Sequence, residues 1–155
     1  MNGKGSALRI GMLVALLLAS AAQSAAEGAI EAAPSATDWH ARQGLYYKRN
    51  WGVEVIGVKP VSSGYMLAFR YRVLDPDKAK LLNDRKAKAY LIDEESGTRL
   101  AVPALENVGE LRSGTAPVVD RNYFMIFGNP GKLVKPGSRV SVVVGNFRVD
   151  GLVVD

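Results

Sequence analysis

The sequence predicts an all-β fold, an antiparallel β-sandwich of about seven strands with one short helix after the second strand. Two observations lead to this prediction. Segments rich in β-branched and aromatic residues recur along residues 44–155, and turn residues separate them about every 8–12 positions, which is typical of sandwiches. Helical patterns do not alternate with these segments, as they would in a parallel α/β sheet. A closed barrel is the alternative architecture.

The first 26 residues have the three parts of a secretory signal peptide. Lys4 and Arg9 precede an apolar run over residues 10–22, and small side chains follow up to Ala26. A retained membrane anchor is the alternative, but a spanning helix needs about 20 apolar residues and this run is shorter. We therefore expect cleavage before Glu27, or a few residues earlier. The mature chain is then periplasmic or secreted and keeps no membrane span.

Residues 27–43 are rich in alanine, serine and small polar side chains, which predicts a flexible linker. The same alanine content also suits a frayed helix. We expect the β-sandwich domain to occupy residues 44–155.

Residues 50–60 and 65–74 predict the first two strands. The first is rich in β-branched side chains and ends at Pro60, before a turn. The second alternates between two faces: one carries Tyr65, Leu67, Phe69, Tyr71 and Val73, and the other carries Met66, Ala68, Arg70 and Arg72. A period of two with arginines on one side predicts one buried face and one solvated face.

The short helix is predicted at residues 75–84. Asp75 is a favourable N-cap, and Pro76 suits the first helical position because its fixed φ matches the helix. Strands are predicted next at residues 87–93 and 98–105. Pro103 places the second of these at a sheet edge, since proline cannot donate to a strand ladder.

Residues 106–121 predict a long loop with little pattern. Residues 122–128 carry apolar side chains on both faces of the expected strand: Tyr123, Met125 and Phe127 on one, and Phe124 and Ile126 on the other. This pattern predicts a central strand covered on both sides. Residues 138–145 and 147–155 predict the last two strands. The final strand runs to Asp155, so we expect the C-terminus to be held in the sheet.

The connection at residues 128–137, GNPGKLVKPG, is best explained by turn chemistry. Proline fixes φ and glycine accepts positive φ, which accounts for nearly every position. A binding loop carrying Lys132 and Lys135 is the alternative. The KPG sequence before a terminal pair of strands resembles a turn of many immunoglobulin-like bacterial modules. This resemblance implies an immunoglobulin-like sandwich and carries no function.

Composition argues against most kinds of chemistry. The chain has no cysteine and a single histidine, His40, so the usual zinc sites and histidine-activated nucleophiles are not expected. We therefore expect no metal, no cofactor and no catalytic residues. The whole chain has a net charge of +5, and removal of residues 1–26, with two basic and no acidic residues, leaves 18 minus 15, or +3. This charge is too mild to predict a nucleic-acid partner.

Two patches are candidates for binding. Residues 44–52 interleave aromatic and basic side chains, a mixture that stacks on rings and attracts anions, although the aromatics could instead close one end of the core. Arg70 and Arg72 could extend this patch as a basic stripe, or form an ordinary solvated face. The full candidate set is Tyr46, Tyr47, Lys48, Arg49, Trp51, Arg70, Arg72, Arg112 and Lys132.

The sequence therefore predicts a non-catalytic exported binding or assembly module of the cell envelope. It would recognise a protein partner through a sheet edge or surface loops. One alternative is a small-molecule or glycan binder that uses the aromatic and basic patch. The other is a carboxylate-dependent hydrolase using Asp93, Glu94 and Glu95, which otherwise suit a solvated hairpin turn. No oligomeric state is predicted.

Overall fold

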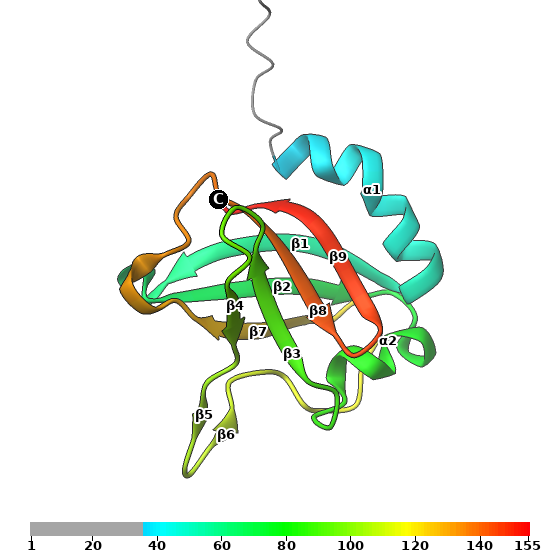
Figure 1. The fold of residues 1–155 in the computed structure, drawn as a ribbon. Helices are drawn as coiled ribbons and strands as arrows, with labels where there is room; N and C mark the ends of the chain where they lie inside the picture. Colours follow the sequence, from blue (N-terminus) through cyan, green and yellow to red (C-terminus); the bar gives the residue numbers. More distant parts are fainter. Residues whose placement is uncertain (1–35) are drawn as a thin grey trace, which may run out of the picture. The chain divides into compact units, whose positions relative to one another are not determined.

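The computed structural model describes residues 36–155, which form two α-helices, two short 3-10 helices and nine strands (Figure 1). This part of the chain is mostly β and its sheets are antiparallel, as predicted. The predicted signal peptide and residues 27–35 of the predicted linker lie outside the described residues.

The strands form three sheets. Sheet A has the order β1-β2-β7 and contains β1 (Val53–Val61), β2 (Met66–Val73) and β7 (Asn122–Gly128). Sheet B has the order β4-β3-β8-β9 and contains β3 (Ala89–Asp93), β4 (Arg99–Ala101), β8 (Arg139–Val144) and β9 (Phe147–Val153). The third is a small hairpin of β5 (Ala104–Leu105) and β6 (Gly109–Glu110), which projects from the rest of the fold (Figure 1).

Side chains of sheets A and B meet in one hydrophobic core. The predicted buried face of β2 is confirmed, because Leu67, Phe69, Tyr71 and Val73 are fully buried. Tyr65 differs from the prediction, since it precedes the strand and is 57% exposed. The C-terminus is held as expected: the N–H of Asp155 donates to the carbonyl of Val58 in β1.

Helix α1 (Ala36–Trp51) is the largest difference from the sequence prediction, because residues 36–43 were expected to be linker. They form its first half instead. Trp39 and Tyr47 are buried in the core, and this burial stabilises a helix whose alanine content alone would leave it frayed. The helix ends at Trp51 and is followed by Gly52, whose φ of +59° lies in the left-handed region that glycine adopts most easily.

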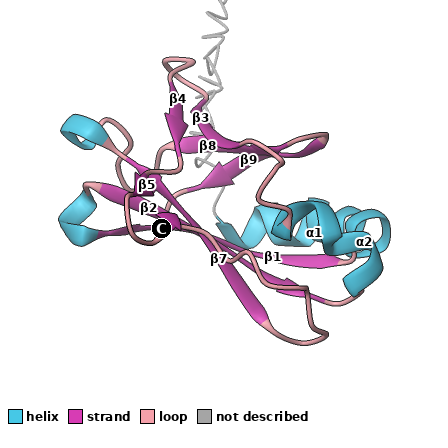
Figure 2. Ribbon diagram, turned by 90° about the horizontal axis from the view of Figure 1, so that it is seen from below, coloured by secondary structure: helices cyan, strands magenta, loops and turns pink. Residues whose placement is uncertain are grey.

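Helix α2 (Pro76–Asn83) confirms the predicted helix and its cap. The Asp75 carboxylate accepts hydrogen bonds from the N–H groups of Asp77 and Lys78, at 3.1 and 3.3 Å. The helix connects β2 of sheet A to β3 of sheet B, and both helices lie at the same end of the strands (Figure 2).

The connection after β7 is held by one buried side chain, Asn129. Its amide donates to the carbonyls of Gly64 and Val134, and its oxygen accepts from the N–H of Val134. These bonds close the turn internally. The long loop at 106–121 is less irregular than predicted, because it contains β6 and residues 111–113 bond to β7.

Candidate functional site

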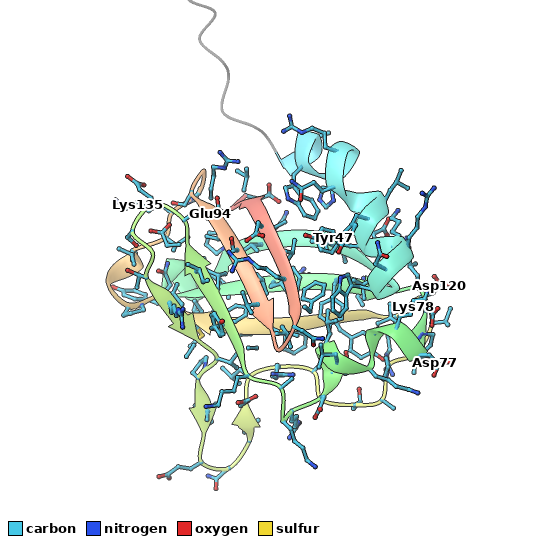
Figure 3. All side chains as sticks on the ribbon, turned by 45° about the vertical axis from the view of Figure 1, so that its right-hand side comes forward. Tyr47, Asp77, Lys78, Glu94, Asp120 and Lys135 are labelled. Atoms are coloured by element: carbon cyan, nitrogen blue, oxygen red, sulfur yellow. The ribbon has the colours of Figure 1, made fainter. Side chains whose placement is uncertain are left out.

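The structure separates the residues that the sequence grouped as one binding patch. Tyr47 is 5% exposed and lies between α1 and the strands (Figure 3). Its ring stacks on Trp39 and meets Phe147 edge-on, and Trp51 also packs edge-on against Phe147 at 5.1 Å. Burial raises the pKa of Tyr47 to about 12. Tyr47 and Trp51 therefore close one end of the core, which is the alternative to a binding patch that the sequence offered for residues 44–52.

Arg112 was expected on a binding loop, but its side chain is fully buried. The guanidinium donates hydrogen bonds to the carbonyls of Ala87, Leu82 and Asp84, at 2.7, 3.2 and 2.5 Å. These carbonyls lie in the last turn of α2 and the segment after it. Arg112 thus satisfies orphan acceptors at a helix C-terminus and is not available to a surface ligand.

The remaining members of the predicted set are dispersed over the surface. Tyr46 is exposed on α1, and the carbonyl of the exposed Arg49 accepts from Lys78 Nζ at 2.9 Å. Lys132 lies over the ring of Tyr65, with Nζ 4.6 Å from the ring centroid. These residues do not form one patch with the sheet arginines.

Lys48 and Arg72 do come together, through a residue outside the predicted set. Glu54 of β1 pairs with Lys48 Nζ at 2.6 Å and with Arg72 Nη2 at 2.5 Å. The hydrogen bond from Lys48 is the largest cause of the lowered pKa of Glu54. Burial opposes it, and the charges of Lys48 and Arg72 lower the pKa further. One carboxylate is therefore shared by two cations.

Strand register aligns the outward side chains of sheet A in rows. One row contains Gly57, Arg70 and Phe124, and the next contains Lys59, Ala68 and Ile126. A hollow of about 420 Å³ lies on this face. Its lining includes Val61, Ala68, Arg70, Phe124 and Ile126. Ala68, which has only a methyl side chain, lies in register between Lys59 and Ile126 at this hollow.

The outer face of β7 differs from the prediction of a strand covered on both sides. Phe124 is 46% exposed and Ile126 is half-buried, whereas the alternate Tyr123, Met125 and Phe127 are buried in the core. No described helix or strand covers Phe124. The sequence signal was present, since residues 124 and 126 are apolar on the face that should be polar, but it was interpreted as burial.

A second hollow, of about 510 Å³, lies where α1 meets β1. His40, Leu45, Lys48, Glu54 and Ile56 belong to its lining. Ile56 sits at the β-bulge of β1, and its carbonyl lies 3.1 Å from His40 Nε2. This contact ties the helix to the edge of sheet A.

The acidic residues of the predicted hairpin turn have local partners. Asp93 accepts hydrogen bonds from the N–H and Oγ of Ser96. Glu94 accepts from Ser141 Oγ at 2.8 Å and from the N–H of Gly151 at 2.6 Å. Figure 3 places Glu94 at the opposite end of the molecule from Asp77 and Asp120. Across residues 36–155, no three His, Cys, Asp or Glu side chains are arranged to hold a metal ion.

Comparisons with known proteins add no family to these observations. Neither a protein-family model, nor a curated protein, nor a solved structure gives a significant match to this chain. Within the described part of the chain, neither α-helix has the length and apolar character required to cross a membrane.

Proposed function

We propose that this protein is a non-catalytic exported binding or assembly module of the cell envelope, and that it recognises a protein partner through the outer face of sheet A. One observation carries the proposal. On the outer face of sheet A, Phe124 is 46% exposed beside a hollow of about 420 Å³. Contiguous exposed apolar surface around a recess is typical of a docking site.

The contacts at the two edges of sheet A favour docking on its outer face over the addition of a strand at an edge. Residues 111–113 bond to the outer edge of β7, through the carbonyl of Leu111 and the N–H of Ser113. At the other edge, β1 contacts α1 and bonds to Asp155. Because both edges of sheet A are occupied, strand addition is less favourable there than docking on the face.

We further propose the immunoglobulin-like sandwich as the finer description of the fold. The orders β1-β2-β7 and β4-β3-β8-β9 support it. The chain passes from sheet A to sheet B after β2, returns to sheet A at β7 by way of the β5–β6 hairpin, and passes to sheet B again after β7, as in Greek-key sandwiches. The parallel bridge between Val58 and Val154 brings the first and last strands together, which a closed barrel would also require.

The non-catalytic part of the proposal rests on how ionisable groups are used. His40 contacts a backbone carbonyl, Glu54 forms ion pairs with two cations, and Asp93 closes a turn. Each of these three side chains binds a group that holds the fold together. Export rests on the signal-peptide pattern in the sequence.

The small-molecule alternative has one specific observation in its favour. The volume of the hollow falls within the range of ligand pockets, about 300–1,000 Å³. It lies on an open sheet face, however, and would leave much of a small ligand in water. Isothermal titration with a panel of glycans, lipids and small aromatic acids separates the two classes, because only the small-molecule function predicts a saturable signal that Phe124→Ser abolishes.

The protein-partner function can be tested by site-specific cross-linking in the native host. A photoreactive amino acid at position 124 should give one discrete adduct with a second protein. The same group at position 105 is the control, because Leu105 is equally exposed, at 49%, on the β5–β6 hairpin. Co-purification of the same protein with the unmodified chain, lost in Phe124→Ser and kept in Leu105→Ser, would support the proposal. Adducts of equal yield at both positions would refute it.

A further inference from the structure

The outer face of sheet A carries more positive than negative charge, and one of its cations, Arg70, has no ion-pair partner among the described side chains. The ionisable side chains on or beside this face are Lys48, Glu54, Lys59, Arg70, Arg72 and Asp155. Lys48 and Arg72 share Glu54 as their ion-pair partner, and Lys59 lies 3.8 Å from Asp155. Arg70 makes no ion pair or side-chain hydrogen bond with any side chain that the structure describes.

The position of Arg70 is set by the strand register. Gly57 lies opposite it on β1 and brings no side chain, while Phe124 lies opposite it on β7. Arg70 also belongs to the lining of the hollow, together with Ala68 and Ile126. An exposed guanidinium therefore stands directly beside an uncovered apolar recess.

From this juxtaposition we propose that the partner docks an acidic–apolar segment, in which an apolar side chain enters the hollow and a neighbouring carboxylate pairs with Arg70. The inference rests on the proposed function and names the chemistry of the partner. A carboxylate suits Arg70 because the planar guanidinium can bind both of its oxygens. Phe124 and Ile126 would lose contact with water on docking, which favours association.

A second copy of this chain is a poorer occupant. An isologous dimer through this face would set one surplus of positive charge against an identical surplus. Like charges brought together at an interface disfavour association. An anionic membrane surface is also a poorer occupant, because lipid-binding surfaces insert protruding apolar side chains. Here the apolar side chains line a recess, which a side chain from a protein can fill.

The test uses a display library of random peptides selected against the purified exported protein, with each enriched peptide resynthesised. We expect peptides in which Asp or Glu adjoins a large apolar residue. Their affinity should fall at least about tenfold for Arg70→Gln and for Phe124→Ser. Arg148→Gln is the control, because Arg148 is exposed on β9 of sheet B. The urea midpoint of each variant confirms that it is folded.

A charge swap gives the sharpest readout. A peptide whose acidic residue is replaced by lysine should lose binding to the wild-type protein and regain it with Arg70→Glu, which a merely structural arginine would not allow. Peptides that need Phe124 but neither Arg70 nor their own acid would overturn this inference and leave the proposed function standing. Failure to enrich any peptide that depends on Phe124 would also overturn it.

A sedimentation experiment tests whether the outer face of sheet A binds lipid instead of a protein segment. Vesicles of phosphatidylcholine alone and of phosphatidylcholine with phosphatidylglycerol are sedimented with the protein. Binding to the anionic vesicles that Arg70→Gln abolishes would overturn the assignment to a protein segment. Equal, weak sedimentation with both vesicle types, together with an acid-dependent peptide, would support it.

Discussion

Replacing Trp39 with alanine tests whether α1 belongs to the folded domain. Trp39 is 3% exposed, stacks on Tyr47, and donates a hydrogen bond from Nε1 to the carbonyl of Asp150 at 2.6 Å. Removing a buried tryptophan side chain costs about 3–5 kcal/mol of unfolding free energy. Trp39→Phe keeps most of the apolar contact and loses the hydrogen bond, so it should cost about 0.5–1.5 kcal/mol for that bond.

Urea titration followed by far-UV circular dichroism measures both changes, and the fluorescence of Trp51 provides an independent probe. Leu45→Ala is the matched control on the same helix, because Leu45 is 60% exposed and should change stability by less than about 0.5 kcal/mol. If residues 36–43 were a linker, Trp39→Ala would behave like this control. A loss below about 1 kcal/mol for Trp39→Ala would therefore refute the packing of α1 described above.

Four further predictions follow from burial, capping and charge. Phe69→Ala should lower the unfolding free energy by about 3–5 kcal/mol, since Phe69 is fully buried, and a loss below about 1 kcal/mol in urea would contradict the core. Arg112→Met should lower the unfolding free energy by at least about 2 kcal/mol, because three buried carbonyls lose their donor and each unpaired one costs about 1–3 kcal/mol. Thermal unfolding that matches the wild type would exclude the capping role. Gly52→Ala should destabilise the protein, because the backbone is left-handed there and a Cβ would lie 2.6 Å from Asp75 Cβ. Gly44→Ala is the control on α1: a Cβ there meets no atom within 4 Å, so the change should stabilise the protein by up to about 1 kcal/mol. Thermal melts measure both changes. Glu54 has a lowered pKa in the folded state, so its contribution is present above the ordinary carboxyl pKa and is lost as pH falls through the lowered value. Glu54→Gln should therefore reduce stability at pH 7 by less than about 1 kcal/mol, as for an ion pair open to solvent, and should match the wild type in strong acid; a difference that grows on acidification would show the wrong sign.

Features that depend on local spacing were predictable from the sequence. The alternation along β2 identified its buried face, because side chains of a strand point to opposite sides with a period of two. Asp75 and Pro76 identified the start of α2, since an N-cap acts on N–H groups only two and three residues away. The turn residues of GNPG act locally as predicted, since Gly131 adopts a φ of +64° and Asn129 bonds to Val134 five residues ahead.

Features that depend on distant partners were decided only by the tertiary structure. Trp39 joins the core through a carbonyl 111 residues away, so alanine-rich composition suggested a linker where the fold forms a helix. Arg112 is buried because carbonyls between Leu82 and Ala87 surround its guanidinium. The apolar outer side of β7 indicated a covered strand, yet Phe124 on that side is 46% exposed. A sequence specifies which side chains are apolar, but the packing of distant elements determines which of them meet water.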